Sequence, residues 1–204
     1  MDQILLLSAD VVDSAAYKSA AAYLGFQPSW VAAFKAFYEE VPLLVTAEVA
    51  NAFFEEEGEF PEVILWKALG DELVFLARPS SPRELELITF SFLRALEGAD
   101  RKLHAEWGFN LHGVAWTFEE GGQNISVRFR ELESKEGDLV FDLIGPDVDL
   151  GFRLVPRSPR GGLLVTEELK HQVPGTHLRF TTIGEAELKG VAKNPYPLIQ
   201  LGHR

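Results

Sequence analysis

Short apolar segments with the length of strands alternate with longer segments of helical periodicity along almost the whole chain. The first, residues 4–7, ends in Ser8-Ala9-Asp10, which predicts a buried strand with a carboxylate at its C-terminal end. Further strands are predicted over residues 63–67, 72–77, 110–118, 125–129, 139–144, 163–165, 178–182 and 198–201. Gly70-Asp71, between the first two of these, indicates a hairpin.

The segments with helical periodicity lie between these strands. Helices are predicted over residues 15–23, 29–54 with an interruption at Pro42, from Pro82 onward, over 148–154, and after the candidate N-cap Thr166. The helix from Pro82 has an apolar stripe made of Leu85, Ile88, Phe92, Leu93 and Leu96. Because helices and strands intermix without a repeat or a linker, the sequence predicts a single α/β (α+β) domain over residues 1–204, built around a mixed sheet.

Composition limits the classes of function. The 204 residues carry a formal net charge of −12, which disfavours a nucleic-acid binder or a protein of an anionic membrane surface. A nucleotide remains a possible substrate, because divalent cations can supply positive charge. The chain has no cysteine, which excludes disulfides, thiolate zinc sites and cysteine nucleophiles. No apolar run has membrane-spanning length and the N-terminus lacks a basic segment, so a soluble cytoplasmic protein is expected.

Two carboxylates stand out by their positions. Asp10 ends the first strand, and Asp71 lies in the turn of the predicted hairpin. If the two strands are neighbours, these side chains converge at one edge of the sheet, where a divalent metal would relieve their repulsion. Aspartates are common at strand ends and in turns, so these positions also have an ordinary structural interpretation. The five histidines (His104, His112, His171, His177 and His203) have no metal-ligand spacing and are interpreted as structural or surface residues.

Four sequence blocks resemble, in order, the signatures of the class III adenylyl and guanylyl cyclases. They are residues 6–14 (LLSADVVDS), 66–72 (WKALGDE), 142–154 (DLIGPDVDLGFRL) and 183–191 (IGEAELKGV). Each block is weak alone, but four in series at compatible spacing are a fairly specific signal. The resemblance implies the class III cyclase fold, a mainly antiparallel mixed sheet with packed helices.

The resemblance also implies a role for each matching residue. Asp10 and Asp71 would bind two divalent ions, Mn²⁺ or Mg²⁺, with the backbone carbonyl of Val11 as a further ligand. Arg153 would stabilise charge on the α-phosphate, and Lys189 would pair with the terminal phosphates. The turn Val12-Asp13-Ser14 would offer backbone N–H groups to phosphate oxygens.

The base and the ribose have their own expected contacts. Lys67 and Asp142 occupy the two base-reading positions, where adenylyl cyclases have a Lys–Asp pair and guanylyl cyclases prefer Glu and Cys. One cation and one carboxylate can satisfy the edge of adenine or of uracil. Asp149 replaces the ribose-orienting Asn of the family, and a phosphate-binding Arg has no clear match. Arg128 and Arg130 are candidate substitutes.

Residues 65–72, 113–116 and 142–153 most resemble the uridylate cyclases of bacterial antiphage (Pycsar) systems, which make cyclic UMP to activate an effector protein. The resemblance therefore implies a UTP cyclase acting in antiphage defence, with an adenylate cyclase as the alternative. It also implies a homodimer with composite active sites, because the metal-binding pair and the base-reading residues come from different protomers in this family. Two other interpretations remain: a catalytically silent module with the cyclase fold, and an unrelated metal-dependent phosphohydrolase.

Overall fold

A seven-stranded sheet forms the centre of the computed structural model, which describes residues 3–20, 23–24, 27–55, 60–129 and 140–204. The strand order is β10-β11-β9-β6-β1-β5-β4. The bounds are β1 (Gln3–Val11), β4 (Val63–Ala68), β5 (Glu72–Ala77), β6 (Leu111–Glu119), β9 (Leu163–Val165), β10 (Leu178–Ala186) and β11 (Tyr196–His203). All neighbours are antiparallel except β6 and β9, which confirms the mixed, mainly antiparallel sheet expected from the sequence.

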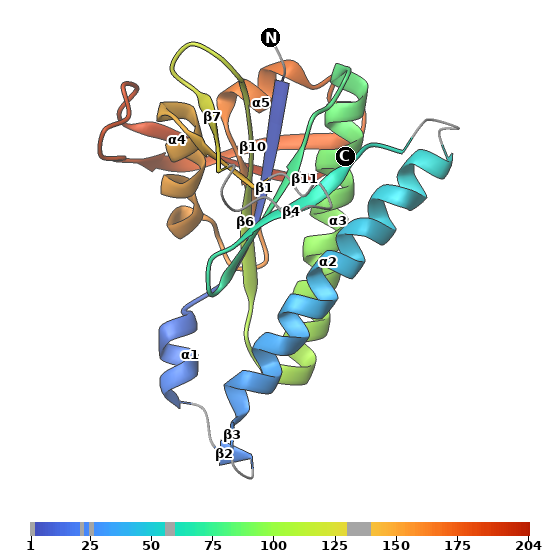
Figure 1. Ribbon diagram of the computed structural model, residues 1–204, viewed down its shortest axis with the longest axis vertical. Coiled ribbons are helices and arrows are strands. Elements are labelled where there is room, and N and C mark those ends of the chain that lie inside the picture. Colours follow the sequence, from blue (N-terminus) through green and yellow to red (C-terminus); the bar gives the residue numbers. More distant parts are fainter. Residues whose placement is uncertain (1–2, 21–22, 25–26, 56–59, 130–139) are drawn as a thin grey trace.

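Two short ribbons and five α-helices complete the described structure. The ribbons pair β2 (Tyr23–Leu24) with β3 (Gln27–Pro28), and β7 (Ile125–Arg128) with β8 (Phe141–Ile144). The helices are α1 (Ser14–Ala20), α2 (Ser29–Glu55), α3 (Pro82–Trp107), α4 (Pro146–Leu154) and α5 (Glu167–Gln172), and the 3₁₀ turn η2 (Val155–Arg157) follows α4. Figure 1 shows α2 and α3 side by side along one side of the sheet, with α4 on the other side. No helix among the described residues combines the length and apolarity that a membrane crossing requires.

The long helix α3 begins and ends where its sequence predicts. Ser81 is its N-cap and accepts a hydrogen bond from the Glu84 N–H, and Pro82 occupies the first turn, where its missing N–H is not needed. Gly108 ends the helix with φ 77°, a left-handed conformation that favours glycine. All five predicted stripe residues of α3 are buried, so the periodicity identified the core-facing side correctly.

The predicted interruption at Pro42 is wrong, because α2 continues through this proline to Glu55. The buried side chains Phe37, Val41, Val45, Val49 and Phe53 form a continuous stripe on both sides of Pro42. They belong to the same core cluster as the stripe of α3. Packing of this face stabilises the helix by more than the one backbone hydrogen bond that proline removes. The first helix, in contrast, is shorter than predicted. It ends at Ala20, before the short β2–β3 ribbon, rather than at residue 23.

Alternation along the central strands sorts their side chains between two cores. Leu5, Leu7 and Ala9 of β1 belong to the core beneath α2 and α3, whereas Ile4 and Leu6 belong to the core beneath α4. Side chains alternate between faces along a strand, so Ser8 and Asp10 share the α4 face. Because both faces of β1 are covered, its sequence is an apolar run rather than an alternation of polar and apolar residues.

The contact between α4 and the sheet depends on Gly151. The indole of Trp116, on β6, is fully buried against this glycine. A Cβ built on Gly151 would lie 2.0 Å from a ring carbon of Trp116, which is far inside van der Waals contact. The absence of a side chain therefore allows α4 to lie close to β6, and α4 carries the candidate site residues Asp149 and Arg153.

We expect Gly151→Ala to destabilise the protein by about 1–3 kcal/mol, since the added methyl must displace a buried indole or lift α4 from the sheet. Gly98→Ala is the matched control, because Gly98 is also helical and a Cβ there meets only Leu44 Cδ1, at 4.0 Å. Alanine has the higher helix propensity, so this control should be neutral or stabilising. Urea denaturation of both variants tests the expectation, and equal effects of the two substitutions would contradict it.

Candidate active site

Three polar side chains from three adjacent strands form a row across the α4 face of the sheet. In the strand register Asp10 lies opposite Glu72 of β5 on one side and opposite His112 of β6 on the other. Directly opposite residues of antiparallel strands point to the same face. The register therefore places two carboxyl groups and an imidazole next to one another at the C-terminal end of β1.

Asp71 lies beside this row, at the turn between β4 and β5. The Val11 N–H donates to the Asp71 carbonyl over 3.0 Å, which holds the end of β1 against the hairpin turn. The Ser14 hydroxyl, at the start of α1, donates to Asp71 Oδ2. The strand that ends in Asp10 and the hairpin that carries Asp71 are therefore neighbours, which is the condition for their convergence.

His112 is a site residue that sequence reasoning missed. Its Nε2 lies 2.9 Å from Asp10 Oδ2, and its Nδ1 lies 2.9 Å from the Ser158 carbonyl. Both partners are acceptors when Asp10 is ionised, so both hydrogen bonds form only with the imidazolium. Burial alone lowers the pKa of His112, but the bonds to Asp10 and Ser158 outweigh it, and the net pKa is raised above 6.5. The spacing of these residues in the sequence does not reveal this contact, because it depends on the pairing of β1 with β6.

Glu72 adds a third carboxyl group to the site. Its Oε1 accepts a hydrogen bond of 2.6 Å from the buried Ser8 hydroxyl. Burial raises the pKa of Glu72 above its usual 4.5, the Ser8 bond opposes this, and repulsion from Asp10 and Asp71 adds to it. Burial is thus the main cause of the raised pKa of Glu72, and the nearby carboxylates of Asp10 and Asp71 raise it further.

The oxygen atoms of these residues suit the coordination of a hard divalent cation. Carboxylate and carbonyl oxygens are the ligands that Mg²⁺ and Mn²⁺ prefer, and Asp10, Asp71 and the Val11 carbonyl supply them at one edge. Within the described residues, no three His, Asp or Glu side chains form a metal cage by themselves. Mg²⁺ in phosphoryl-transfer sites is commonly held by one or two carboxylates together with substrate phosphates, and these residues suit that arrangement.

Lys67 and Asp142 form an ion pair on the same face of the sheet. Lys67 Nζ lies 2.5 Å from Asp142 Oδ1 and 4.2 Å from the centre of the Trp66 ring. The Trp66 indole N–H donates to the Phe141 carbonyl over 3.2 Å and attaches β8 to the edge strand β4. Both members of the pair are about a quarter to a third exposed, so the ion pair is open to a ligand.

A β-bulge in β4 turns the Lys67 side chain towards the α4 face of the sheet. Leu65 lies opposite Phe75, but Lys67 lies opposite Val74, so Trp66 is the extra residue of β4. Regular pairing would place Lys67 opposite Leu73, whose side chain faces α2 and α3. The bulge instead places it opposite Val74, which faces the α4 side.

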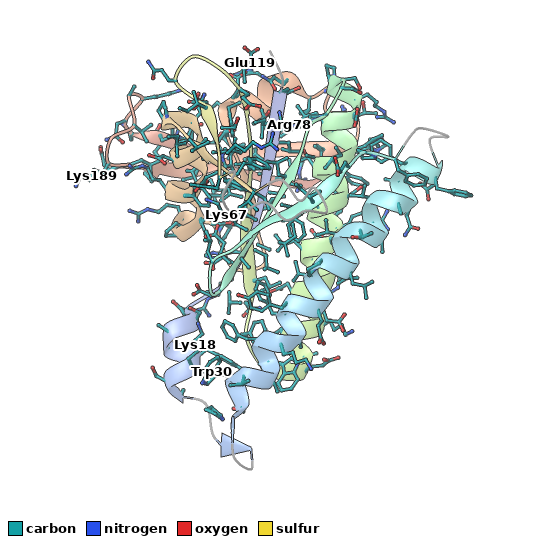
Figure 2. The ribbon with its side chains drawn as sticks, viewed as in Figure 1. Lys18, Trp30, Lys67, Arg78, Glu119 and Lys189 are labelled. Atoms are coloured by element: carbon teal, nitrogen blue, oxygen red, sulfur yellow. The ribbon has the colours of Figure 1, made fainter. Side chains whose placement is uncertain are left out.

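Within the described residues, Arg153 and Lys189 form no ion pair with Asp10, Asp71 or Glu72. The Arg153 guanidinium is partly exposed, lies 4.0 Å from Asp149, and would be 3.7 Å from a Cβ at Gly190. The third and fourth sequence blocks therefore meet in space. Lys189 is exposed at the outer edge of the molecule, well separated from Lys67, as Figure 2 shows.

The turn predicted to bind phosphates is partly engaged in other contacts. The Val12 N–H donates to the Asn110 carbonyl over 2.9 Å, so this amide already has a partner. Asp13 has φ 53° and its carboxylate forms an exposed ion pair of 2.7 Å with Arg160. Of the two candidate phosphate-binding arginines, Arg128 is exposed on β7 and has an interaction partner, and Arg130 lies outside the described residues.

Comparison with solved structures identifies the fold. The chain superposes on the adenylyl cyclase CyaB from P. aeruginosa with a TM-score of 0.64 and 12% identity, over 98% of this chain and 94% of that one. It superposes on the guanylate cyclase domain of RhGC from Catenaria anguillulae, solved with GTP, with a TM-score of 0.63 and 11% identity, over 100% and 96% of the two chains. No family model matches the sequence, and no curated protein is similar to it in sequence. The chain thus has the fold of adenylyl and guanylyl cyclase catalytic domains.

We expect Glu72→Gln to stabilise the metal-free protein near pH 8 and to have less effect towards pH 4.5. Because the folded-state pKa of Glu72 is raised, the contribution of this group to stability is complete below its unfolded value and is lost as pH rises through the folded pKa. Glutamine removes this loss and keeps an acceptor for Ser8.

Glu120→Gln is a control of opposite sign. Hydrogen bonds from Ser126 and Arg78 lower the pKa of Glu120, so its contribution is present above the unfolded value and is lost as pH falls. Thermal unfolding of both variants from about pH 8 down to about pH 3 measures the difference, because the contribution of Glu120 is lost only below its unfolded value. A uniform loss of stability in Glu72→Gln at every pH would contradict the expectation.

Proposed function

We propose that this protein is a nucleotidyl cyclase, which converts a nucleoside triphosphate into a 3′,5′-cyclic nucleotide and pyrophosphate. The proposal rests mainly on one observation: in a cyclase fold, strand pairing and the Val11–Asp71 hydrogen bond place Asp71 beside Asp10 at the end of β1. The Lys67–Asp142 pair adds a group that can recognise a base, and in the proposed homodimer it would complete the site formed by the carboxylates of the partner subunit.

The proposed roles follow from the chemistry of the side chains. Asp10, Asp71 and the Val11 carbonyl would hold two divalent ions, Mn²⁺ or Mg²⁺, which would acidify the ribose 3′-hydroxyl and neutralise the triphosphate. Arg153 would stabilise charge on the α-phosphate, for which a planar guanidinium is suited. Asp149 would accept a hydrogen bond from the ribose, and Lys189 would pair with the terminal phosphates.

The proposed substrate is UTP. Lys67 can donate to uracil O4 while Asp142 accepts from N3–H. The preference over ATP is supported by the sequence resemblance to uridylate cyclases, which also supports a role in antiphage signalling through cyclic UMP. Adenylate cyclase is the second candidate, since the same pair can bind N1 and N6 of adenine.

A homodimer with composite sites is part of the proposal. The edge strand β4, its turn and the β7–β8 ribbon expose large aliphatic side chains: Leu65, Leu69, Ile125 and Ile144 are 44–49% exposed. Exposed apolar side chains on the strands that carry a polar site support an interface at these elements. A second copy on this surface would bring its own Arg153 towards the carboxylates of the first.

The function is tested by incubating the protein with each of the four nucleoside triphosphates and Mn²⁺. We expect cyclic UMP from UTP, and a loss of about 100-fold or more in Arg153→Ala, which removes a transition-state donor. Product analysis by mass spectrometry separates the outcomes. Cyclic AMP as the main product would support the adenylate cyclase, pyrophosphate without a cyclic product would indicate a hydrolase, and no turnover at all would indicate a silent binding module.

The composite site is tested by mixing two inactive variants, Asp71→Ala and Arg153→Ala. In a symmetric dimer half of the dimers are mixed, and each mixed dimer has one intact site of two, so activity should return to about a quarter of the wild-type value. Each variant alone is the control. If no mixing ratio restores activity although light scattering verifies that dimers are present, each active site is formed within one chain.

A further inference from the structure

We propose that His112 is a positioning residue that fixes the carboxylate of Asp10 for binding a divalent cation. The inference rests on the proposed metal-binding role of Asp10 and adds a residue outside the four blocks that resemble cyclase signatures. His112 lies on β6, directly opposite Asp10, and only 7% of its surface is exposed.

The ring of His112 is held at both nitrogens. Nδ1 contacts the Ser158 carbonyl over 2.9 Å, and Nε2 contacts Asp10 Oδ2 over the same distance. Ser158 is itself held in place, because it is buried and donates its N–H to the Val155 carbonyl and its hydroxyl to the Gly162 carbonyl. A ring fixed at one nitrogen gives the carboxylate at the other nitrogen a single preferred orientation.

Close packing of the two strands supports this contact. A Cβ on Gly113, the residue after His112, would lie 2.2 Å from the Ser8 carbonyl oxygen. Glycine at this position therefore allows β6 to approach β1 closely where His112 faces Asp10. The contact joins two adjacent strands of the central sheet, and sites built on strands hold their geometry better than sites on loops.

The hydrogen bond leaves one oxygen of Asp10 for a cation. His112 uses Oδ2, so Oδ1 is the oxygen that remains. Asp71 shows the same arrangement, because the Ser14 hydroxyl donates to its Oδ2. Each candidate ligand is thus held at one oxygen by a buried donor, which favours cation binding through the other oxygen.

Two substitutions test the hydrogen bonds of the two ring nitrogens of His112 separately. The amide nitrogen of glutamine can replace Nε2, so His112→Gln keeps a donor for Asp10 and loses the anchor to Ser158. The amide nitrogen of asparagine can replace Nδ1, so His112→Asn keeps the anchor and loses the donor. His171→Asn is the control, since His171 is exposed on α5.

The readout is Mn²⁺ affinity of nucleotide-free protein, measured by electron paramagnetic resonance. We expect His112→Asn to bind Mn²⁺ about 10–100-fold more weakly, as for other residues that orient metal ligands, and His112→Gln to remain closer to wild type. Thermal unfolding monitors folding of each variant. Wild-type affinity in a folded His112→Asn, or equal losses in both variants, would overturn the inference.

Asp10→Ala distinguishes this result from failure of the proposed function. If Asp10→Ala does not weaken Mn²⁺ binding, the metal-binding role of Asp10 is wrong and this inference fails with it. If Asp10→Ala weakens binding and His112→Asn does not, only the positioning role fails. Should the His112 variants not fold, a ¹H–¹⁵N NMR spectrum of the wild type tests the contact: Mg²⁺ should shift the Nε2 resonance of His112 and not that of His171, and an unshifted His112 would overturn the inference.

Discussion

The pairing of β1 with β5 on one side and β6 on the other is the interaction on which the rest of the structure depends. It fills the centre of both cores, and its register aligns Glu72, Asp10 and His112 across three strands. A slip of one residue in β1 would exchange its two faces, so the aliphatic side chains that fill both cores also fix the side to which Asp10 points.

This alignment concentrates negative charge where the sheet is well packed. Glu72 shows the effect through its raised pKa, caused by burial and by the neighbouring carboxylates. The surrounding donors offset part of it: Ser8 donates to Glu72, Ser14 to Asp71, and His112 contacts Asp10. Negative charge held together in this way lowers stability, which is typical of functional sites. Under the proposed function, divalent cations would neutralise the charge that these donors do not offset.

Two local irregularities place the other candidate residues. The bulge at Trp66 turns Lys67 to the α4 face, where it meets Asp142. Gly151 lets α4 lie against Trp116, which fixes the helix that carries Asp149 and Arg153. Both features are properties of the packed structure: a bulge exists only relative to a partner strand, and the need for Gly151 arises only because an indole lies beneath it.

The sequence by itself determined most elements and the mixed fold class, because periodicity, caps and turn residues act within short segments. It placed Asp10 at a strand end and Asp71 in a hairpin turn, but only the pairing of β1 with β5 brings them close to each other. It did not determine that α2 continues through Pro42, since packing against α3 outweighs a local preference. It also did not identify His112 or Glu72 as parts of the site. Their proximity to Asp10 arises from strand register between residues far apart in the chain, and only the tertiary structure decides that register.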